Sequence, residues 1–537
     1  MALVCRAFYE PAMNVLWREL RGLRPLIECL PKDTFEYDAV DNMPVSICAL
    51  LASLPLIRDY KTMVRDPCPD EWMRFQHHAP HVRKLILLPH GYGDDYTYCC
   101  VDYSCFDAVK SSHPGGPILS TLQELFVIDK SAMQYASLFV QPSLKVVEGA
   151  YTTWDDGSTL DFLQAIAERC PLLQAINFSD NDDPGTPPMA KALEHVLLSS
   201  KHLTSVNVEA SISPDALVHL STLPTLIALR FDLNNVDYRA VLSSTPEPKF
   251  PSLLHMDIRP SSQHLEPLVD LLSTMSAKHL RTLQIFLKLY HDEDSFEDDY
   301  MLYRPPNAQL LHRLYATLPK FKQLRTLEIL PETYESHFTE YIISGDALHP
   351  LLQLHELSEL HMSRTPFALG PDDVERMAKA WPNLKSLRLG DLGRRSDPEV
   401  RPTDLLHFVR HCPQLTCLGL QLLCEDEQTP TDGRAVEGCP ESPLRTLHLG
   451  EDTIIKDVAS LAAFLSDAFP LAQVKHHYFS FEGEPPEWAE QIEEVQRLKE
   501  IFVAVRVQER KTSARRYTAV PPSLDVARTD SREEDSE

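Results

Sequence analysis

The chain has 537 residues, and its 51 Lys and Arg against 78 Asp and Glu give a formal net charge of −27. This acidity argues against nucleic acid as the main partner, because phosphates would be repelled. Hydrophobic residues make up 43% of the chain, so most of it can fold around a core. No apolar run approaches the roughly 20 residues of a membrane span, and the first residues lack the pattern of a signal peptide.

The twelve cysteines are scattered and show no spacing of a disulfide framework. Such usage is typical of reduced thiols. We therefore expect a cytoplasmic or nuclear protein that is not secreted.

Residues 1–31 differ from the rest, with apolar stripes at helical spacing on either side of Pro11. They contain the runs L-V-C-x-A-F-x-E-P-A (3–12), L-W-R-E-L (16–20) and P-L-I-x-C-L-P (25–31). These runs resemble the C-terminal end of an F-box, as it occurs in large fungal families where leucine-rich repeats follow. The resemblance implies a small α-helical F-box remnant that contacts a Skp-type linker subunit. Its contact residues would be Leu3, Val4, Phe8 and Trp17.

An F-box normally opens with a Leu-Pro-containing helix and a second helix, and neither precedes the matching residues in this sequence. Three interpretations follow for residues 1–31. The sequence is truncated at its start, the protein has lost the ligase role, or the segment is an N-terminal cap that shields the first repeat.

Residues 32–117 are expected to hold a linker helix at 45–54, a first repeat at Val82, and a Gly-, Tyr- and Cys-rich loop insertion over 90–117. Residues 118–475 form a leucine-rich-repeat region, interrupted by loops at 180–188 and 291–300. A capping helix is expected within 476–510, over residues 486–508, and residues 511–537 are too polar to bury a core and should be disordered.

The repeats are marked by the pattern L-x-x-L-x-L, as in Leu384/Leu387/Leu389, which suits a short strand with one face buried. The preceding residues 371–380 have apolar positions at the spacing of a helix. Most intervals between matches lie in or near the roughly 20–29 residues of a leucine-rich repeat. One match is weak, because Gly149 occupies its last apolar position. The first positions of the matches are Val82, Leu122, Leu144, Leu173, Leu203, Leu226, Leu253, Leu280, Leu324, Leu357, Leu384, Leu415 and Leu444. The pattern predicts an α/β solenoid, in which a curved parallel strand array carries outer helices.

Motifs of catalysis and metal binding have little support. His77, His78 and His81 lack a Cys or carboxylate partner at ligand spacing, and the cysteines from Cys412 to Cys424 do not follow a zinc pattern. No phosphate-binding or nucleophile motif occurs. We expect neither an enzyme nor a cofactor or metal.

What remains is the outward side of the strands, where residues alternate with the buried leucines. Arg, His and carboxylate side chains share these positions and would suit recognition of a polar protein surface or a modified peptide. The candidate target-binding residues are Arg230, Asp257, Arg259, Glu328, His361, Arg388 and His448. With the resemblance, they indicate the substrate-recognition subunit of a Skp–cullin–F-box ubiquitin ligase. The alternative is a ligase-independent scaffold or inhibitor. We expect a monomer outside any complex.

Overall fold

The computed structural model describes residues 6–38, 60–87, 104–113, 116–128, 132–150, 157–179, 187–233, 249–260, 265–287, 308–331, 342–363, 365–390, 398–424, 439–450, 453, 455–476 and 487–518. The chain forms two compact units. Unit 1 holds residues 1–336 and 347–361, and unit 2 holds residues 337–346 and 362–537. Among the described helices, none combines the length and apolarity needed to cross a membrane.

Unit 1 opens with a helix and a strand that precede the first predicted repeat. Its first elements are α1 (Arg6–Leu16), β1 (Glu19–Arg21), α2 (Arg24–Ile27), η1 (Lys32–Thr34), β2 (Phe35–Asp38), β3 (Tyr60–Met63), η2 (Pro69–Trp72), α4 (Met73–His78) and η3 (Ala79–His81). β2 and β3 pair antiparallel to each other, whereas β1 pairs parallel to the first repeat strand, β4 (Lys84–Leu87).

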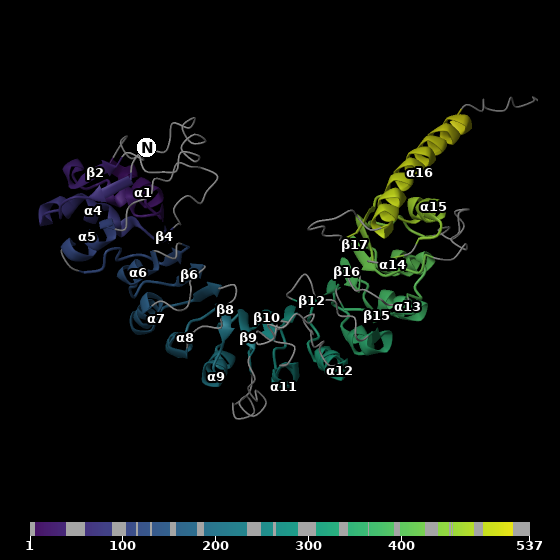
Figure 1. The fold of residues 1–537 in the computed structure, drawn as a ribbon, viewed down its shortest axis with the longest axis horizontal. Coiled ribbons are helices and arrows are strands. Elements are labelled where there is room, and N and C mark those ends of the chain that lie inside the picture. Colours follow the sequence, from purple (N-terminus) through teal and green to yellow (C-terminus); the bar gives the residue numbers. More distant parts are fainter. Residues whose placement is uncertain are drawn as a thin grey trace, which may run out of the picture. The chain divides into compact units, whose positions relative to one another are not determined.

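The main sheet of unit 1 is parallel, with its strands in chain order and one strand for each repeat (Figure 1). After β1 and β4 come β5 (Glu124–Val127), β6 (Val146–Ala150), β7 (Ala175–Ser179), β8 (Ser205–Ser211), β9 (Ala228–Leu233), β10 (His255–Pro260), β11 (Thr282–Leu287), β12 (Thr326–Pro331) and β14 (Glu359–Met362). Helices connect these strands along one side of the sheet (Figure 1). They are α5 (Ser104–Ser112), α6 (Met133–Ala136), η5 (Ser137–Phe139), α7 (Gly157–Arg169), α8 (Pro187–Ser199), α9 (Pro214–Thr222), α11 (Leu265–Thr274), α12 (Ala308–Thr317), η7 (Leu318–Lys320) and η8 (Gly345–Gln353).

Unit 2 repeats this arrangement with fewer strands. Its elements are β13 (Ile343–Ser344), β15 (Phe367–Ala368), α13 (Pro371–Ala380), β16 (Ser386–Leu389), η9 (Pro402–Leu405), α14 (Leu406–His411), β17 (Cys417–Leu420), β18 (Thr446–Leu449), α15 (Val458–Ala468), β19 (Gln473–Lys475) and α16 (Glu487–Thr518). Strands β16 to β19 pair parallel in sequence order, and β13 pairs parallel with β15.

The leucine pattern is confirmed at every predicted position. Each of the thirteen first apolar residues is buried, and a strand begins two residues after it, as β16 does at Ser386 after Leu384. Leu387 and Leu389 point into the core, as the period of two requires. The predicted helix at 371–380 is α13, with Val374, Met377 and Ala378 buried. The fold is a leucine-rich-repeat solenoid, because one parallel strand and one helical connection recur with this buried spacing.

The structure corrects three expectations. Residues 1–31 are not purely helical, since Glu19–Arg21 forms β1 and its Leu20 is buried. The 90–117 insertion contains a helix, α5, where Cys105, Phe106 and Val109 are buried at helical spacing. The terminal helix continues past residue 510 to Thr518, because no helix-breaking residue interrupts it.

Other expectations fall partly or wholly beyond the described residues. The helix at 45–54, the loop at 291–300 and most of the loop at 180–188 lie outside the part that the structure describes. The last two residues of the latter loop, Pro187 and Pro188, begin α8, where proline is tolerated because the first helical N–H groups have no partner in the helix.

Candidate functional site on the strand face

One row of outward side chains runs across unit 1 on the side of the sheet opposite the helices, which we call the strand face. The strand register aligns Asn177, Asn207, Arg230 and Asp257 on neighbouring strands, and then Gln284, Glu328 and His361. We call these seven residues the central row. The register thus brings four of the predicted target-binding residues into one line: Arg230, Asp257, Glu328 and His361.

A cluster of charges occupies the middle of this row. Glu209 Oε1 lies 3.0 Å from Arg230 Nη2 and 3.0 Å from Arg259 Nη2, so one carboxylate joins two guanidinium groups. Arg230 Nε lies 3.0 Å from Asp257 Oδ2. Asp232 is aligned with Arg259 across β9 and β10. These five residues, Glu209, Arg230, Asp232, Asp257 and Arg259, form the charge cluster. Glu209 is only 6% exposed, and its charge-assisted hydrogen bonds hold the two arginines in place.

The charge cluster has three carboxylates, Glu209, Asp232 and Asp257, against two guanidinium groups. Burial is the main reason that the pKa of Asp257 is raised from 3.8 to about 6; Arg230 opposes the increase, and the carboxylates of Glu209, Asp232 and Glu328 add to it. The excess of carboxylates over guanidinium groups favours a cation over an anion at this place on the strand face.

A second network continues the row toward β14. Gln284 Nε2 donates to Glu328 Oε2 at 2.8 Å, and His361 Nδ1 lies 3.1 Å from Glu328 Oε1. The hydrogen bond from His361 is the main reason that the pKa of Glu328 is lowered, against the opposing effect of burial. Glu328 is therefore an ionised acceptor fixed by both neighbouring strands.

The two other predicted target-binding residues lie in unit 2. Arg388, Gly419, His448 and Lys475 follow each other in the register of β16 to β19. Arg388 is half-buried, whereas His448 is buried and offers little surface to a partner.

The structure describes two of the four predicted linker contacts, Phe8 and Trp17. Leu3 and Val4 lie outside the described residues. Phe8 is 56% exposed on α1, near the exposed Val15 and Leu16, which lie seven and eight residues on and so share its helix face. Trp17 instead stacks on His78, with ring centroids 4.3 Å apart.

The three histidines after the N-terminal segment hold α1 in place. His77 Nε2 shares a hydrogen bond of 2.9 Å with the hydroxyl of Tyr9, and His81 Nδ1 lies 2.8 Å from Asn14 Oδ1. Together with the stacking of His78 on Trp17, they form a seam of three contacts. The sequence shows no metal-ligand spacing around these histidines, and their contacts to α1 could not be seen from it.

Two of the three cysteines from Cys412 to Cys424 belong to the core, and Cys417 is half-buried. Cys412 ends α14 and its thiol lies 3.4 Å from the carbonyl oxygen of Trp381. Burial raises the pKa of both Cys412 and Cys424 to about 12. Both thiols are therefore protonated at neutral pH, which disfavours metal ligation.

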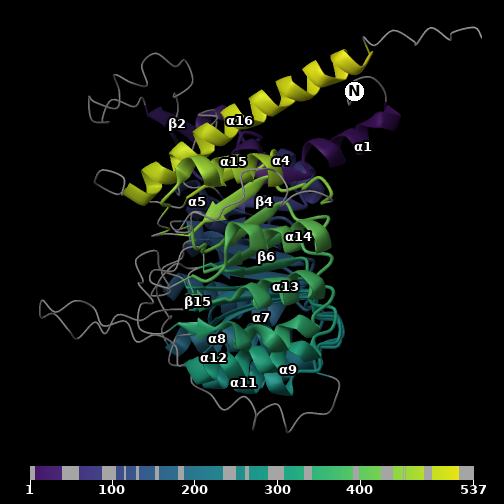
Figure 2. The same ribbon diagram turned by 90° about the vertical axis from the view of Figure 1, so that its right-hand side faces the viewer.

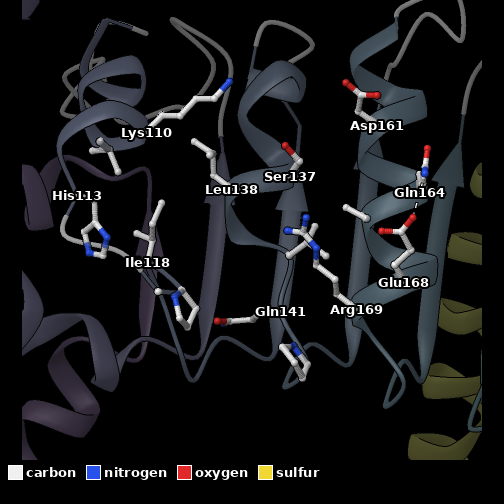
Figure 3. A pocket seen from close by; sticks show the side chains of 16 residues that line it. Lys110, His113, Ile118, Ser137, Leu138, Gln141, Asp161, Gln164, Glu168 and Arg169 are labelled. Carbon is white, nitrogen blue, oxygen red and sulfur yellow. Dashed lines mark hydrogen bonds between the residues drawn. The ribbon is translucent and has the colours of Figure 1, made fainter.

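A groove of about 910 Å³ opens on the helix side of unit 1, between α5 and α7 (Figure 3). Its origin is the short interval from Leu122 to Leu144, which leaves room only for α6 and η5 between the neighbouring helices. Lys110 and Arg169 line it together with Asp161 and Glu168. Because both signs of charge are present, the groove does not select a charged ligand.

Sequence reasoning missed Glu209, which joins the two arginines of the charge cluster. It lies two residues after Asn207, so the period of two points it outward as well. The irregular register of β8 against β9, between Asn207 and Ser211, brings it over the neighbouring strands and could not be read from the sequence. Gln284, Asn177 and Asn207 were missed too, although strand alternation alone could have found them.

No model of a known protein family matches the chain. No curated protein matches it either. Among solved structures, it is similar to a leucine-rich-repeat protein of Leptospira interrogans, at 12% identity over 75% of this chain and 92% of that chain, with a TM-score of 0.33. The repeat architecture follows from this chain's own strand register and buried leucines.

Proposed function

We propose that the chain is a protein-binding module that recruits a target through the strand face of unit 1. The observation that carries this proposal is the charge cluster, in which Glu209 fixes Arg230 and Arg259 beside Asp257. Side chains that are held before binding lose little conformational entropy when a partner arrives. No catalytic residue is assigned in this proposal, and we infer a binding role without an enzymatic one.

The target is proposed to present Lys or Arg side chains. Glu209, Asp232, Asp257 and Glu328 supply four carboxylates near the middle of the row, against the two guanidinium groups of Arg230 and Arg259. Both arginines pair with carboxylates of this set, so the excess of carboxylates over guanidinium groups decides the preference and disfavours a phosphate or another anion. This arrangement favours a basic segment over the modified peptide that the residue types alone had allowed.

A charge-neutral variant tests this surface. Asp232→Asn with Glu328→Gln removes two carboxylates and keeps the side-chain shapes. Proximity crosslinking in cells, followed by mass spectrometry, should show loss of the main crosslinked protein from this variant. The matched control, Asp161→Asn with Glu168→Gln, removes two carboxylates from the helix-side groove and should keep it. If both variants lose the main crosslinked protein to the same extent, or if neither loses it, recognition through the strand face is contradicted.

We further propose that the module is the substrate-recognition subunit of a Skp–cullin–F-box ubiquitin ligase. The support is the resemblance of residues 1–31 to the end of an F-box, together with the apolar face of α1. Phe8, Val15 and Leu16 are exposed on that face, where they are available to a linker subunit.

The alternative, a ligase-independent scaffold or inhibitor, is favoured by the way the same segment joins the repeats. Residues Glu19–Arg21 extend the repeat sheet as β1, and Trp17 stacks on His78. Both features serve an N-terminal cap.

Co-purification with a Skp-type linker subunit separates the two proposals. The chain, a version extended upstream, and Phe8→Asp in each background should be compared, with the exposed Gln76→Asp as the control. Binding that Phe8→Asp abolishes and Gln76→Asp leaves intact supports the ligase adaptor. If neither the chain nor its extended version binds, the scaffold proposal stands and the adaptor proposal fails.

A further inference from the structure

Helix α16 has two parts with different surroundings in unit 2 (Figures 1 and 2). Ile492 and Val495 are buried, and Lys499 donates from Nζ to the carbonyl oxygen of Ala472. Arg506, farther on, pairs with Asp467 of α15 at 2.6 Å. These residues are three, four and seven positions apart, so they mark one docked face of the helix.

The opposite face carries an apolar segment where α16 leaves α15. Ile501 and Val505 are each 47% exposed, Val507 is 43% exposed, and Ala504 between them is exposed too. A helical segment with apolar residues around its circumference is normally covered by another element. Within the part of the chain that the structure describes, this segment is not covered by unit 2.

Charges are segregated on the two sides of this segment. From Glu487 to Glu500 the helix has five acidic and two basic residues, whereas residues 506–516 have five basic and one acidic. A second copy of the helix that runs antiparallel would bring each acidic half against a basic half and the two apolar segments together. A parallel copy would bring like charges together.

We propose that α16 is a self-association surface, on which a second copy of this chain docks through its own α16 in antiparallel orientation. A twofold axis passes near Val503, so the positions of Glu490 and Glu493 on one copy lie opposite positions 511 and 515 on the other. Such a pairing is isologous and closes at two copies. Antiparallel overlap centred on Val503 spans about 30 residues, or about 45 Å of helix. This surface is separate from the strand face and does not depend on the function proposed above.

The contact is expected to be weak and sensitive to conditions. Its apolar centre is short, so dissociation in the micromolar range is expected. Two chains with a net charge of −27 repel each other, and physiological salt is needed to screen that repulsion to a Debye length of about 8 Å. The sequence alone had led us to expect a monomer outside any complex.

Reciprocal charge exchange tests the proposal. Glu490→Lys with Glu493→Lys places basic residues opposite the basic positions 511 and 515 of the second copy, and Lys511→Glu with Arg515→Glu places acidic residues opposite the acidic positions 490 and 493. In sedimentation velocity at physiological salt, the unchanged full chain should dimerise, and each exchanged chain alone should be monomeric. An equimolar mixture of the two exchanged chains should dimerise again, which also shows that both are folded.

A chain that carries all four exchanges should self-associate like the unchanged chain. Ile501→Glu with Val505→Glu should be monomeric, because it removes the apolar centre. An unchanged chain that stays monomeric over the micromolar range overturns the proposal. So does a mixture of the exchanged chains that fails to associate, since a partner other than α16 would not obey the reciprocal exchange.

Discussion

Phe178 fills the space that a side chain on Gly149 would occupy. The two residues face each other across β6 and β7, and a Cβ built on Gly149 would lie 2.7 Å from Phe178 Cε1. Gly149 stands at the last apolar position of its repeat, where the other strands carry a larger residue. Phe178 is 1% exposed, so the next repeat supplies the apolar volume that this repeat lacks.

Restoring the repeat pattern at this position should therefore destabilise the protein. Gly149→Leu is expected to lower the free energy of unfolding by about 3 kcal/mol, because the added atoms overlap the buried ring of Phe178, which cannot move freely. The measurement is the urea midpoint of unfolding. Gly149→Leu with Phe178→Ala should be more stable than the sum of the two single changes predicts, by about 1–2 kcal/mol. Simple additivity would contradict direct competition for one space.

This pair shows what the sequence could and could not predict. The thirteen strands followed from leucine spacing, because burial with a period of two leaves a local signature. Gly149 weakened one match, and the sequence did not explain it, because Phe178, which fills the space above this glycine, lies 29 positions later in the next repeat. The strand face was likewise predicted from alternation, but the pairing of Glu209 with two arginines depends on an irregularity in β8. Contacts between repeats are not visible in a local pattern.

Gln496 forms a hydrogen bond with the edge of β19, the last strand of unit 2. Its side-chain Oε1 accepts a hydrogen bond of 2.8 Å from the backbone N–H of Val474 in β19. β19 pairs with β18 on its other side, so α16 covers an edge that could otherwise recruit another strand.

Gln496→Ala should leave this N–H without its partner and cost about 1 kcal/mol. The change should appear as faster hydrogen exchange of Val474 and a lower urea midpoint for the unfolding of unit 2. Gln508→Ala, on the exposed part of the same helix, is the control and should alter neither. Unchanged exchange at Val474 in Gln496→Ala would show that the edge is protected in another way.

Asp257 should make stability depend on pH. Its folded pKa, about 6, lies above the ordinary value of 3.8, so the folded chain binds a proton more tightly than the unfolded chain does. The stabilisation from this proton is complete below about pH 4 and is lost as pH rises through about 6. The rise of this pKa from 3.8 to about 6 corresponds to a contribution of at most ~3 kcal/mol to the free energy of unfolding.

Asp257→Asn removes the titrating proton. Its stability relative to the unchanged chain should therefore rise between pH 4.5 and 7.5, as measured by urea unfolding at each pH. The control is Asp161→Asn, which removes an exposed carboxylate on the helix side. Its difference in stability from the unchanged chain should stay the same across this pH range. If the difference for Asp257→Asn falls with increasing pH, then ion pairing with Arg230 outweighs burial.

The stacking of Trp17 on His78 should hold α1 against the first repeat. Trp17→Ala removes the stacked ring contact of the seam, whose ring centroids lie 4.3 Å apart, so hydrogen exchange in α1 should become faster. Leu16→Ala changes a neighbouring residue that is exposed, and should leave exchange unchanged.

Acidification should loosen the same contact. Burial lowers the pKa of His78, and the charges of His77 and His81 lower it further, so docked α1 binds a proton less tightly than released α1 does. As pH falls through about 6.5, the ordinary pKa of histidine, proton binding favours release. Exchange in α1, corrected for its intrinsic pH dependence, should therefore rise between pH 7.5 and 5.5 in the unchanged chain. In His78→Gln this rise should be smaller, because the buried titrating group is gone. A rise of equal size in both chains would show that His78 does not control the release of α1.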